Sequence, residues 1–135
     1  MTALQGSCAI LGSTGSVGRQ ALEVAAALGV RVDLLAAGHS VARMEEEARA
    51  CLPRVCVMSD PAAARELAVR LADTSVRVVG GEEALLFEIE ASPAEVFVNA
   101  ILGKAGLAPT LAVCRTGRRL ALSNKESMVI AGEAV

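Results

Sequence analysis

The sequence predicts an α/β fold in which a mostly parallel sheet carries helices on both faces. Short apolar segments alternate along the chain with segments whose apolar residues recur at helical spacing. Most of the short segments are continuous apolar runs, which are typical of strands buried on both faces of a parallel sheet. The length of 135 residues fits one domain. We therefore expect a Rossmann-type doubly wound sheet of about six strands, formed by one domain over residues 1–135.

Six apolar segments are the expected strands. The first stops at Gly12 and the second at Gly38, so each runs directly into a glycine-containing loop. The segments are residues 7–11, 30–37, 54–58, 76–79, 95–99 and 119–122.

The expected helices are delimited by residues with known end preferences. Gly29 and Gly117 follow two of them as C-caps, and Pro53 stops another. Ser59-Asp60-Pro61 combines an N-cap with a proline in the first helical turn. The helices are residues 16–28, 41–51, 61–71, 81–91 and 107–115, and the last residues of the chain begin another.

The composition excludes several classes of function. The chain has two Phe, no Trp and no Tyr, so it lacks the aromatic faces on which bases stack. A net charge of −2 gives no electrostatic footprint for nucleic acid or an anionic membrane. Apolar runs stay far below the roughly 20 residues of a membrane span, and the N-terminus lacks the basic start of a secretory signal. We expect a cytoplasmic protein that binds neither nucleic acid nor membrane.

The four cysteines do not have the spacing of a metal site. They form no Cys-x-x-Cys pair, and the single histidine, His39, is distant from them in sequence. We expect reduced, mostly buried thiols at Cys8, Cys51, Cys56 and Cys114. The charged residues Arg118, Arg119 and the run 45–47 are expected to be solvated surface charges.

The segment Gly12-Ser13-Thr14-Gly15-Ser16-Val17-Gly18 lies after a predicted strand and before a predicted helix. Gly12 permits a tight turn, Gly15 lets the backbone approach a pyrophosphate, and Gly18 lets the helix pack on the strand. The helix N-terminus offers unpaired N–H groups and partial positive charge to phosphates. The segment is therefore a candidate phosphate loop, and the alternative is a glycine-rich turn that binds nothing.

The end of the second strand bears on the choice of nucleotide. An NAD site commonly has Asp or Glu there to hold the ribose 2′-hydroxyl. This chain has Ala37-Gly38-His39-Ser40 instead, and Asp33 falls inside the strand. Without a carboxylate a 2′-phosphate fits better, with Ser40, His39 and the next helix N-terminus as donors. The pattern favours NADP, although a loop histidine without a role is the alternative at His39.

Four segments, in this order and spacing, resemble one enzyme family. "ILGSTGSVGRQALEV", "LLAAGHSV", "NAILGKAGLAPTLAV" and "ALSNKESMVIAGE" are similar to 1-deoxy-D-xylulose 5-phosphate reductoisomerases. The resemblance implies reduction and rearrangement of 1-deoxy-D-xylulose 5-phosphate to 2-C-methyl-D-erythritol 4-phosphate in isoprenoid precursor synthesis. It also implies NADPH and a divalent cation, Mg or Mn, as cofactors and a homodimeric full-length enzyme.

The resemblance further implies roles for individual residues. Thr14, Gly15, Ser16 and Val17 match the family's pyrophosphate loop, and Gly38, His39 and Ser40 match its 2′-phosphate loop, where the family often has Lys or Arg near position 39. Asn124 and Glu126 would hydrogen-bond the nicotinamide half of NADPH, and Lys125 would reach oxygens of the phosphorylated sugar substrate. Lys104 departs from a usually small residue and is assigned no role.

The resemblance places the metal-binding carboxylates and substrate-phosphate ligands after the last residue of this chain. Glu82 and Glu83 diverge on a helix and do not replace them, so no metal or catalytic residue is expected within residues 1–135. The chain is therefore expected to be the N-terminal cofactor domain of a longer enzyme, which binds NADPH without turnover.

Two other classes of protein remain open. The first is a free-standing NADP-sensing domain. The second is the cofactor domain of another NADP-dependent dehydrogenase. Extended short-chain dehydrogenases need a Tyr-x-x-x-Lys pair that this chain lacks, and semialdehyde dehydrogenases need a nucleophilic cysteine, for which helical Cys114 is poorly placed.

Overall fold

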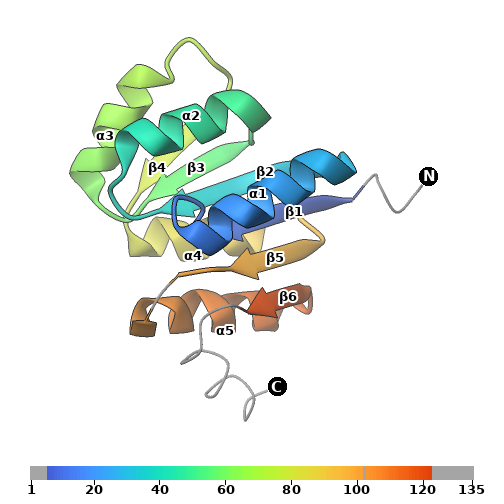
Figure 1. Cartoon of the computed structure of the whole chain (residues 1–135). Helices are drawn as coiled ribbons and strands as arrows, with labels where there is room; N and C mark the ends of the chain where they lie inside the picture. Colours follow the sequence, from blue (N-terminus) through green and yellow to red (C-terminus); the bar gives the residue numbers. More distant parts are fainter. Residues whose placement is uncertain (1–5, 102, 123–135) are drawn as a thin grey trace.

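The computed structural model describes residues 6–101 and 103–122, which form one six-stranded sheet flanked by helices (Figure 1). All paired strands are parallel, and their order is β4-β3-β2-β1-β5-β6. The strands are β1 (Ser7–Leu11), β2 (Arg31–Ala37), β3 (Val55–Met58), β4 (Arg77–Gly80), β5 (Val96–Asn99) and β6 (Arg119–Leu122). The predicted doubly wound α/β fold is confirmed for these residues.

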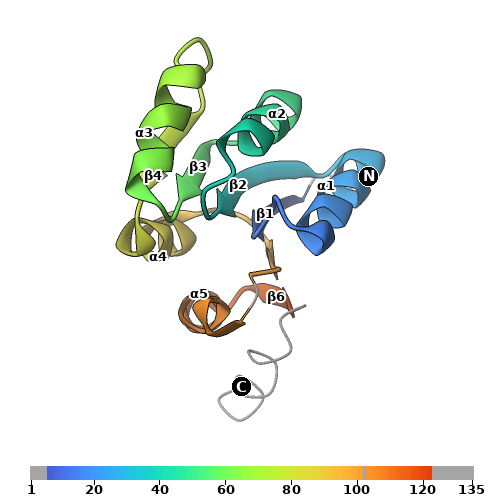
Figure 2. The ribbon, with the colours of Figure 1, turned by 60° about the vertical axis from the view of Figure 1, so that its left-hand side comes forward.

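The helices cover the two faces of the sheet in sequence order. The first three are α1 (Ser16–Leu28), α2 (Val41–Cys51) and α3 (Pro61–Arg70), and the last two are α4 (Glu82–Ala91) and α5 (Leu107–Thr116). Figure 2 shows α1, α2 and α3 on one side of the sheet and α4 and α5 on the other. This arrangement follows from right-handed crossovers, because the strand order reverses direction at the connection from β4 to β5.

Two separate hydrophobic cores hold these layers together. The first lies under α1, α2 and α3 and includes Ile10, Leu35 and Met44, each fully buried. The second lies under α4 and α5 and includes Leu34 and Phe97, also fully buried. The sheet is thus buried on both faces, as continuous apolar strands require.

The ends of the elements follow the predicted signals closely, with shifts of at most one residue. Gly29 and Gly117 are left-handed C-caps, as expected. Asp60 is the N-cap of α3, where its side chain accepts a hydrogen bond from the Ala62 amide. None of the helices in the described part of the chain is long and apolar enough to cross a membrane.

The predicted thiols are free cysteines, and two of them, Cys8 and Cys56, are buried. Cys51 and Cys114 are only partly buried. Burial raises the pKa of Cys51 to about 11 and that of Cys56 to about 12, so neither is a thiolate at neutral pH.

A buried ion-pair network lies at the amino ends of the strands. The β1–β2 register shifts by one residue at Cys8 and Ala9, and this irregularity accommodates Asp33 among the apolar residues of β2. The Arg54 Nε and Asp33 Oδ1 atoms are 3.1 Å apart, and the Arg54 Nη1 and Glu88 Oε1 atoms are 3.3 Å apart. Ser92 also donates to Asp33, at 2.5 Å. Arg54 therefore joins β2 to α4 through two carboxylates that are nearly inaccessible to water.

We predict that Arg54→Met lowers the free energy of unfolding by about 2–4 kcal/mol, because Asp33 and Glu88 then stay buried with fewer partners. The matched control is Arg49→Met. The Arg49 side chain is 41% exposed, close to the 38% of Arg54, but it pairs with the largely exposed Asp73. That control should cost at most about 1 kcal/mol. Urea unfolding measures both values, and equal losses would show that the network adds no more than a surface pair.

Candidate cofactor-binding site

The loop between β1 and α1 is compact because two of its glycines lie against other backbone atoms. Gly12 has φ +84°, and a Cβ there would lie 2.8 Å from the Ala100 carbonyl oxygen in the segment after β5. A Cβ on Gly18 would lie 2.2 Å from the Gly12 carbonyl oxygen. The Gly12 and Ser13 amides both donate to the Ala36 carbonyl of β2, at 2.7 and 3.0 Å. The loop is thereby fixed between β1, β2 and β5.

Gly15 differs from these two glycines because nothing within the described residues requires it. Its φ of −80° is open to any residue. A Cβ there would meet only the Gly12 carbonyl oxygen, at an ordinary 3.6 Å. Gly15 and Ser16 are exposed, so the backbone at this point faces solvent. An exposed glycine that the fold does not need is consistent with close approach of a ligand to the backbone.

The N-terminus of α1 is electrostatically open to an anion. Gly15 is its N-cap and makes no side-chain capping bond, and the first turn contains no acidic residue. The first N–H groups of the helix therefore carry partial positive charge without a carboxylate to offset it.

The segment after β2 lies beside this loop. His39 and Ser40 are exposed, and Ser40 is the N-cap of α2, where its side chain makes no capping hydrogen bond. The first turn of α2 also lacks acidic residues. The sequence has no carboxylate at the end of this strand, and the structure places there a second helix N-terminus that is open to an anion.

Strands β1 and β5 are neighbours in the sheet, and the connections that follow them run in opposite directions. Ligands bind at such a switch point in open α/β sheets. Asn99 ends β5 fully buried, and its Nδ2 atom donates to the Gly106 carbonyl at 2.8 Å and to the Thr110 hydroxyl at 2.7 Å. The Asn99 side-chain Oδ1 atom accepts from the Ile101 amide. Asn99 thereby fixes the turn after β5 against α5. The sequence analysis did not identify this role of Asn99.

The structure brings together the two predicted phosphate-binding segments, Thr14–Val17 and Gly38–Ser40, at the carboxyl ends of adjacent strands. The remaining predicted site residues, Asn124, Lys125 and Glu126, lie outside the described residues. Among residues 6–101 and 103–122, no group of His, Cys, Asp or Glu side chains could hold a metal ion.

Two expectations about surface charge were wrong. Arg118 is only partly exposed, and its guanidinium donates to the Ser92 carbonyl, which fixes it at the end of α4. In the acidic run, Glu45 pairs with Arg49 and Arg70 on the surface, but Glu47 is half-buried. The run is therefore not a uniformly solvated helix face, because Glu47 lies beside Met44 and Ala48, the buried residues of α2.

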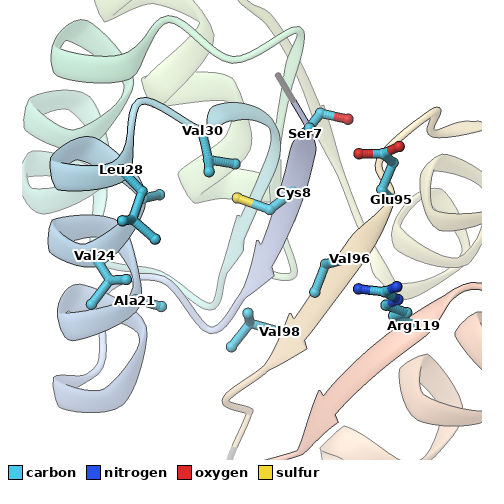
Figure 3. Close-up of a pocket in the computed structure, with 12 residues that line it drawn as sticks. Ser7, Cys8, Ala21, Val24, Leu28, Val30, Glu95, Val96, Val98 and Arg119 are labelled. Carbon is cyan, nitrogen blue, oxygen red and sulfur yellow. The ribbon is translucent and has the colours of Figure 1, made fainter. Parts of the chain in front are cut away.

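A cavity of about 770 Å³ lies away from these loops, near the amino ends of β1, β5 and β6 (Figure 3). Val24 and Leu28 of α1 stand across from Val96 and Val98 of β5, and Arg119 lies at one side. The walls of the cavity are largely aliphatic, and the cavity lies at the opposite edge of the sheet from the glycine-rich loop. The cavity is therefore distinct from the candidate cofactor site.

A doubly wound sheet with a glycine-rich loop at the switch point defines the class of α/β nucleotide-binding domains. The family model for 1-deoxy-D-xylulose 5-phosphate reductoisomerase matches residues 8–132. The chain belongs to this family.

Individual relatives agree with this assignment. The reductoisomerase of Halothermothrix orenii is 43% identical over 128 residues, which are 93% of this chain and 33% of that protein. The enzyme of Desulfitobacterium hafniense is 40% identical over 128 residues, covering 93% of this chain and 34% of that protein. The chain thus spans about a third of the length of these relatives.

Solved structures of the same enzyme have the same fold. The Zymomonas mobilis enzyme in complex with NADPH matches with a TM-score of 0.90 and 33% identity, over 96% of this chain and 35% of that one. A complex of the enzyme with NADPH, fosmidomycin and magnesium matches with a TM-score of 0.87 and 32% identity, over 95% of this chain and 32% of that one.

Two of the loop glycines, Gly18 and Gly15, should respond differently to an added methyl group. We predict that Gly18→Ala lowers the free energy of unfolding by about 2 kcal/mol, because its Cβ would overlap backbone atoms of Gly12 and Ser13. Gly15→Ala should change it by about 0.5 kcal/mol or less, because the added Cβ meets no close neighbour. Thermal melting of both variants tests this difference, and a large loss for Gly15→Ala would assign that glycine to the fold instead.

Proposed function

We propose that this chain is the NADPH-binding portion of a 1-deoxy-D-xylulose 5-phosphate reductoisomerase. The observation that carries the proposal is the exposed backbone at Gly15, which adjoins an uncapped helix N-terminus at the switch point of the sheet. The geometry fits a dinucleotide pyrophosphate, since it combines a glycine that the fold does not require with unpaired N–H groups. Complexes of matching solved enzymes with NADPH support the same conclusion.

In this proposal the two adjacent loops bind different phosphates. Thr14, Gly15, Ser16 and Val17 would hold the pyrophosphate with backbone N–H groups and hydroxyls. Gly38, His39 and Ser40 would hold the 2′-phosphate at the N-terminus of α2. Since no carboxylate lies at the end of β2, the site would not repel a 2′-phosphate and lacks the usual partner of a free 2′-hydroxyl.

The rest of the activity is proposed for the longer enzyme. Asn124 and Glu126 would contact the nicotinamide half, from which NADPH supplies the hydride, and Lys125 would contact oxygens of the phosphorylated sugar. A divalent cation, Mg or Mn, would be held by residues beyond 135, so this portion alone should bind NADPH without turnover. We further propose a homodimeric enzyme that acts in the cytoplasm.

Cofactor selectivity tests the binding site directly. We predict that NADPH binds at least about tenfold more tightly than NADH, since charged hydrogen bonds to a 2′-phosphate contribute about 1.5–3 kcal/mol. Gly15→Val should abolish most of the affinity for both, because the branched side chain would occupy the position of the pyrophosphate. Calorimetry measures these affinities, and circular dichroism checks that the variant is folded. Equal affinity for NADH, or full affinity in folded Gly15→Val, would refute the assignment.

The role of Lys125 is tested in the full-length enzyme. Lys125→Ala should lower turnover by about 10²–10³, because a cation that stabilises developing charge on the substrate is lost. NADPH binding should stay nearly unchanged in this variant, whereas Asn124→Ala should weaken it. Steady-state kinetics and cofactor titration separate these effects, and near-normal turnover in Lys125→Ala would remove its proposed role.

A further inference from the structure

The side of the sheet that carries α1 is incompletely covered at β5. Helix α5 packs on β5 and β6 from the other side, where Phe97 is fully buried. On the α1 side, Val96 and Val98 are only half-buried, although α1 contacts β1, β2 and β5. Helices normally cover both faces of a parallel sheet. The described part of the chain therefore leaves one layer incomplete over β5.

Strand β6 continues this incompletely covered face. Residues that pair in register across two parallel strands point to the same face of the sheet. The pairs are Val96 with Arg119 and Val98 with Ala121. Arg119 and Ala121 are exposed, whereas Leu120 between them packs against the core under α4 and α5. The face of β6 on the α1 side is therefore open to solvent in this part of the chain.

Helix α1 forms the wall opposite these strands. Val24 and Leu28 are 57% and 51% exposed, and they lie four residues apart on one face of the helix. Both line the cavity of about 770 Å³ that Figure 3 shows, across from Val96 and Val98. We call this surface the α1–β6 groove. Its wall is Val24 and Leu28, its floor is Val96 and Val98, and Arg119 lies at its margin.

The residues of the α1–β6 groove indicate what would cover it. Val69 on α3 and Phe87 on α4 are also exposed, but they do not line the groove. Single exposed apolar residues are normal, whereas a contiguous apolar strip marks a binding surface. Val24 and Leu28 form a ridge of the kind that packs against another helix. Among the described residues, the Arg119 side chain has no ion pair or hydrogen bond, so a carboxylate suits it.

We propose that the α1–β6 groove is the docking surface for an amphipathic helix that a later part of the longer enzyme returns to this domain. The helix would place aliphatic residues against Val96 and Val98 and an Asp or Glu beside Arg119. The proposal rests on the proposed function in one respect, since only a longer enzyme supplies this helix.

The length of the relatives and the handedness of the sheet favour this occupant. The chain covers 33% of the Halothermothrix orenii enzyme, so a protein of that length has enough chain to return to this domain. The segment directly after β6 is a weaker candidate. A right-handed connection from β6 to a further parallel strand at the same edge would lie on the α5 side, away from the groove.

Docking in this groove is separate from the proposed cofactor contacts. Val24 and Leu28 lie in the C-terminal half of α1, whereas the phosphate loop adjoins its N-terminus at Gly15. Substitutions of exposed groove residues should therefore leave the affinity for NADP⁺ nearly unchanged.

Photo-crosslinking in the full-length enzyme identifies the occupant. The probe is p-benzoylphenylalanine at Val24, an exposed position from which it reaches the groove without displacing a buried side chain. We expect an intrachain crosslink to a peptide beyond residue 135 that contains aliphatic residues and Asp or Glu, identified by mass spectrometry. The matched control is the same probe at Val69, which is 77% exposed and should not crosslink to that peptide. If circular dichroism shows that the Val24 variant misfolds, the probe is placed at Leu28.

Hydrogen exchange in the full-length enzyme gives a second readout. Leu28→Asp should speed exchange at residues 96–99 by at least about tenfold, because a carboxylate in the groove disfavours the docked helix. Val69→Asp places the same charge at an exposed valine outside the groove and should leave this exchange unchanged.

A crosslink from Val24 to residues 123–135 or to a second copy of the chain would overturn the proposal, as would unchanged exchange in Leu28→Asp. Titration of the same samples with NADP⁺ separates this proposal from the proposed function. If the enzyme binds NADP⁺ and no later segment is crosslinked, the proposed function stands and the docking proposal fails. If the crosslink forms and NADP⁺ does not bind, the docking proposal stands and the cofactor assignment fails.

Discussion

The close approach of the β1–α1 loop to the backbone around it is the constraint on which the site depends. Gly18 lies against the Gly12 carbonyl, and Gly12 lies against Ala100 in the turn after β5. These contacts leave no space for a side chain, so α1 begins immediately above the carboxyl end of β1. The helix N-terminus therefore faces the switch point. A bulkier residue at either glycine would move the N-terminus of α1 away from the switch point, where it could interact with a bound phosphate.

The two edges of the sheet differ in role: residues at the amino ends of the strands stabilise the fold, and residues at the carboxyl ends form the proposed binding site. At the amino ends, Asp33, Arg54, Glu88 and Ser92 are bound to one another, and their polar groups are satisfied within the protein. At the carboxyl ends, α1 and α2 both begin without a side-chain cap and without acidic residues in their first turns. Helix ends that are left unsatisfied in this way are less stable than capped ones, so the open donors are better explained by a ligand than by the fold.

Local patterns predicted most of the fold because strands and helices have distinct apolar periods and ends. Gly29, Gly117 and Asp60 ended or began helices as expected. The same reasoning failed for Arg118 and Glu47, whose surroundings come from parts of the chain that are distant in sequence. Arg118 donates to the Ser92 carbonyl at the end of α4, and Glu47 is half-buried because of how α2 packs in the domain. Such contacts depend on tertiary arrangement and leave no periodic signal. The roles assigned to residues 124–126 stay predictions.

The contact between Ser13 and Met44 of α2 also links the two segments that are proposed to bind phosphates. Helix α2 begins after Ser40, in the segment proposed to bind the 2′-phosphate, and Met44 in its first turn contacts Ser13 of the glycine-rich loop. A shift of α2 on binding one phosphate would therefore change the support of the loop that binds the other. Because Met44 is fully buried in the core, the helix resists such a shift, and the two loops keep a fixed separation. A fixed separation favours a ligand that carries both phosphate groups at matching positions, which is the property that distinguishes NADPH from NADH.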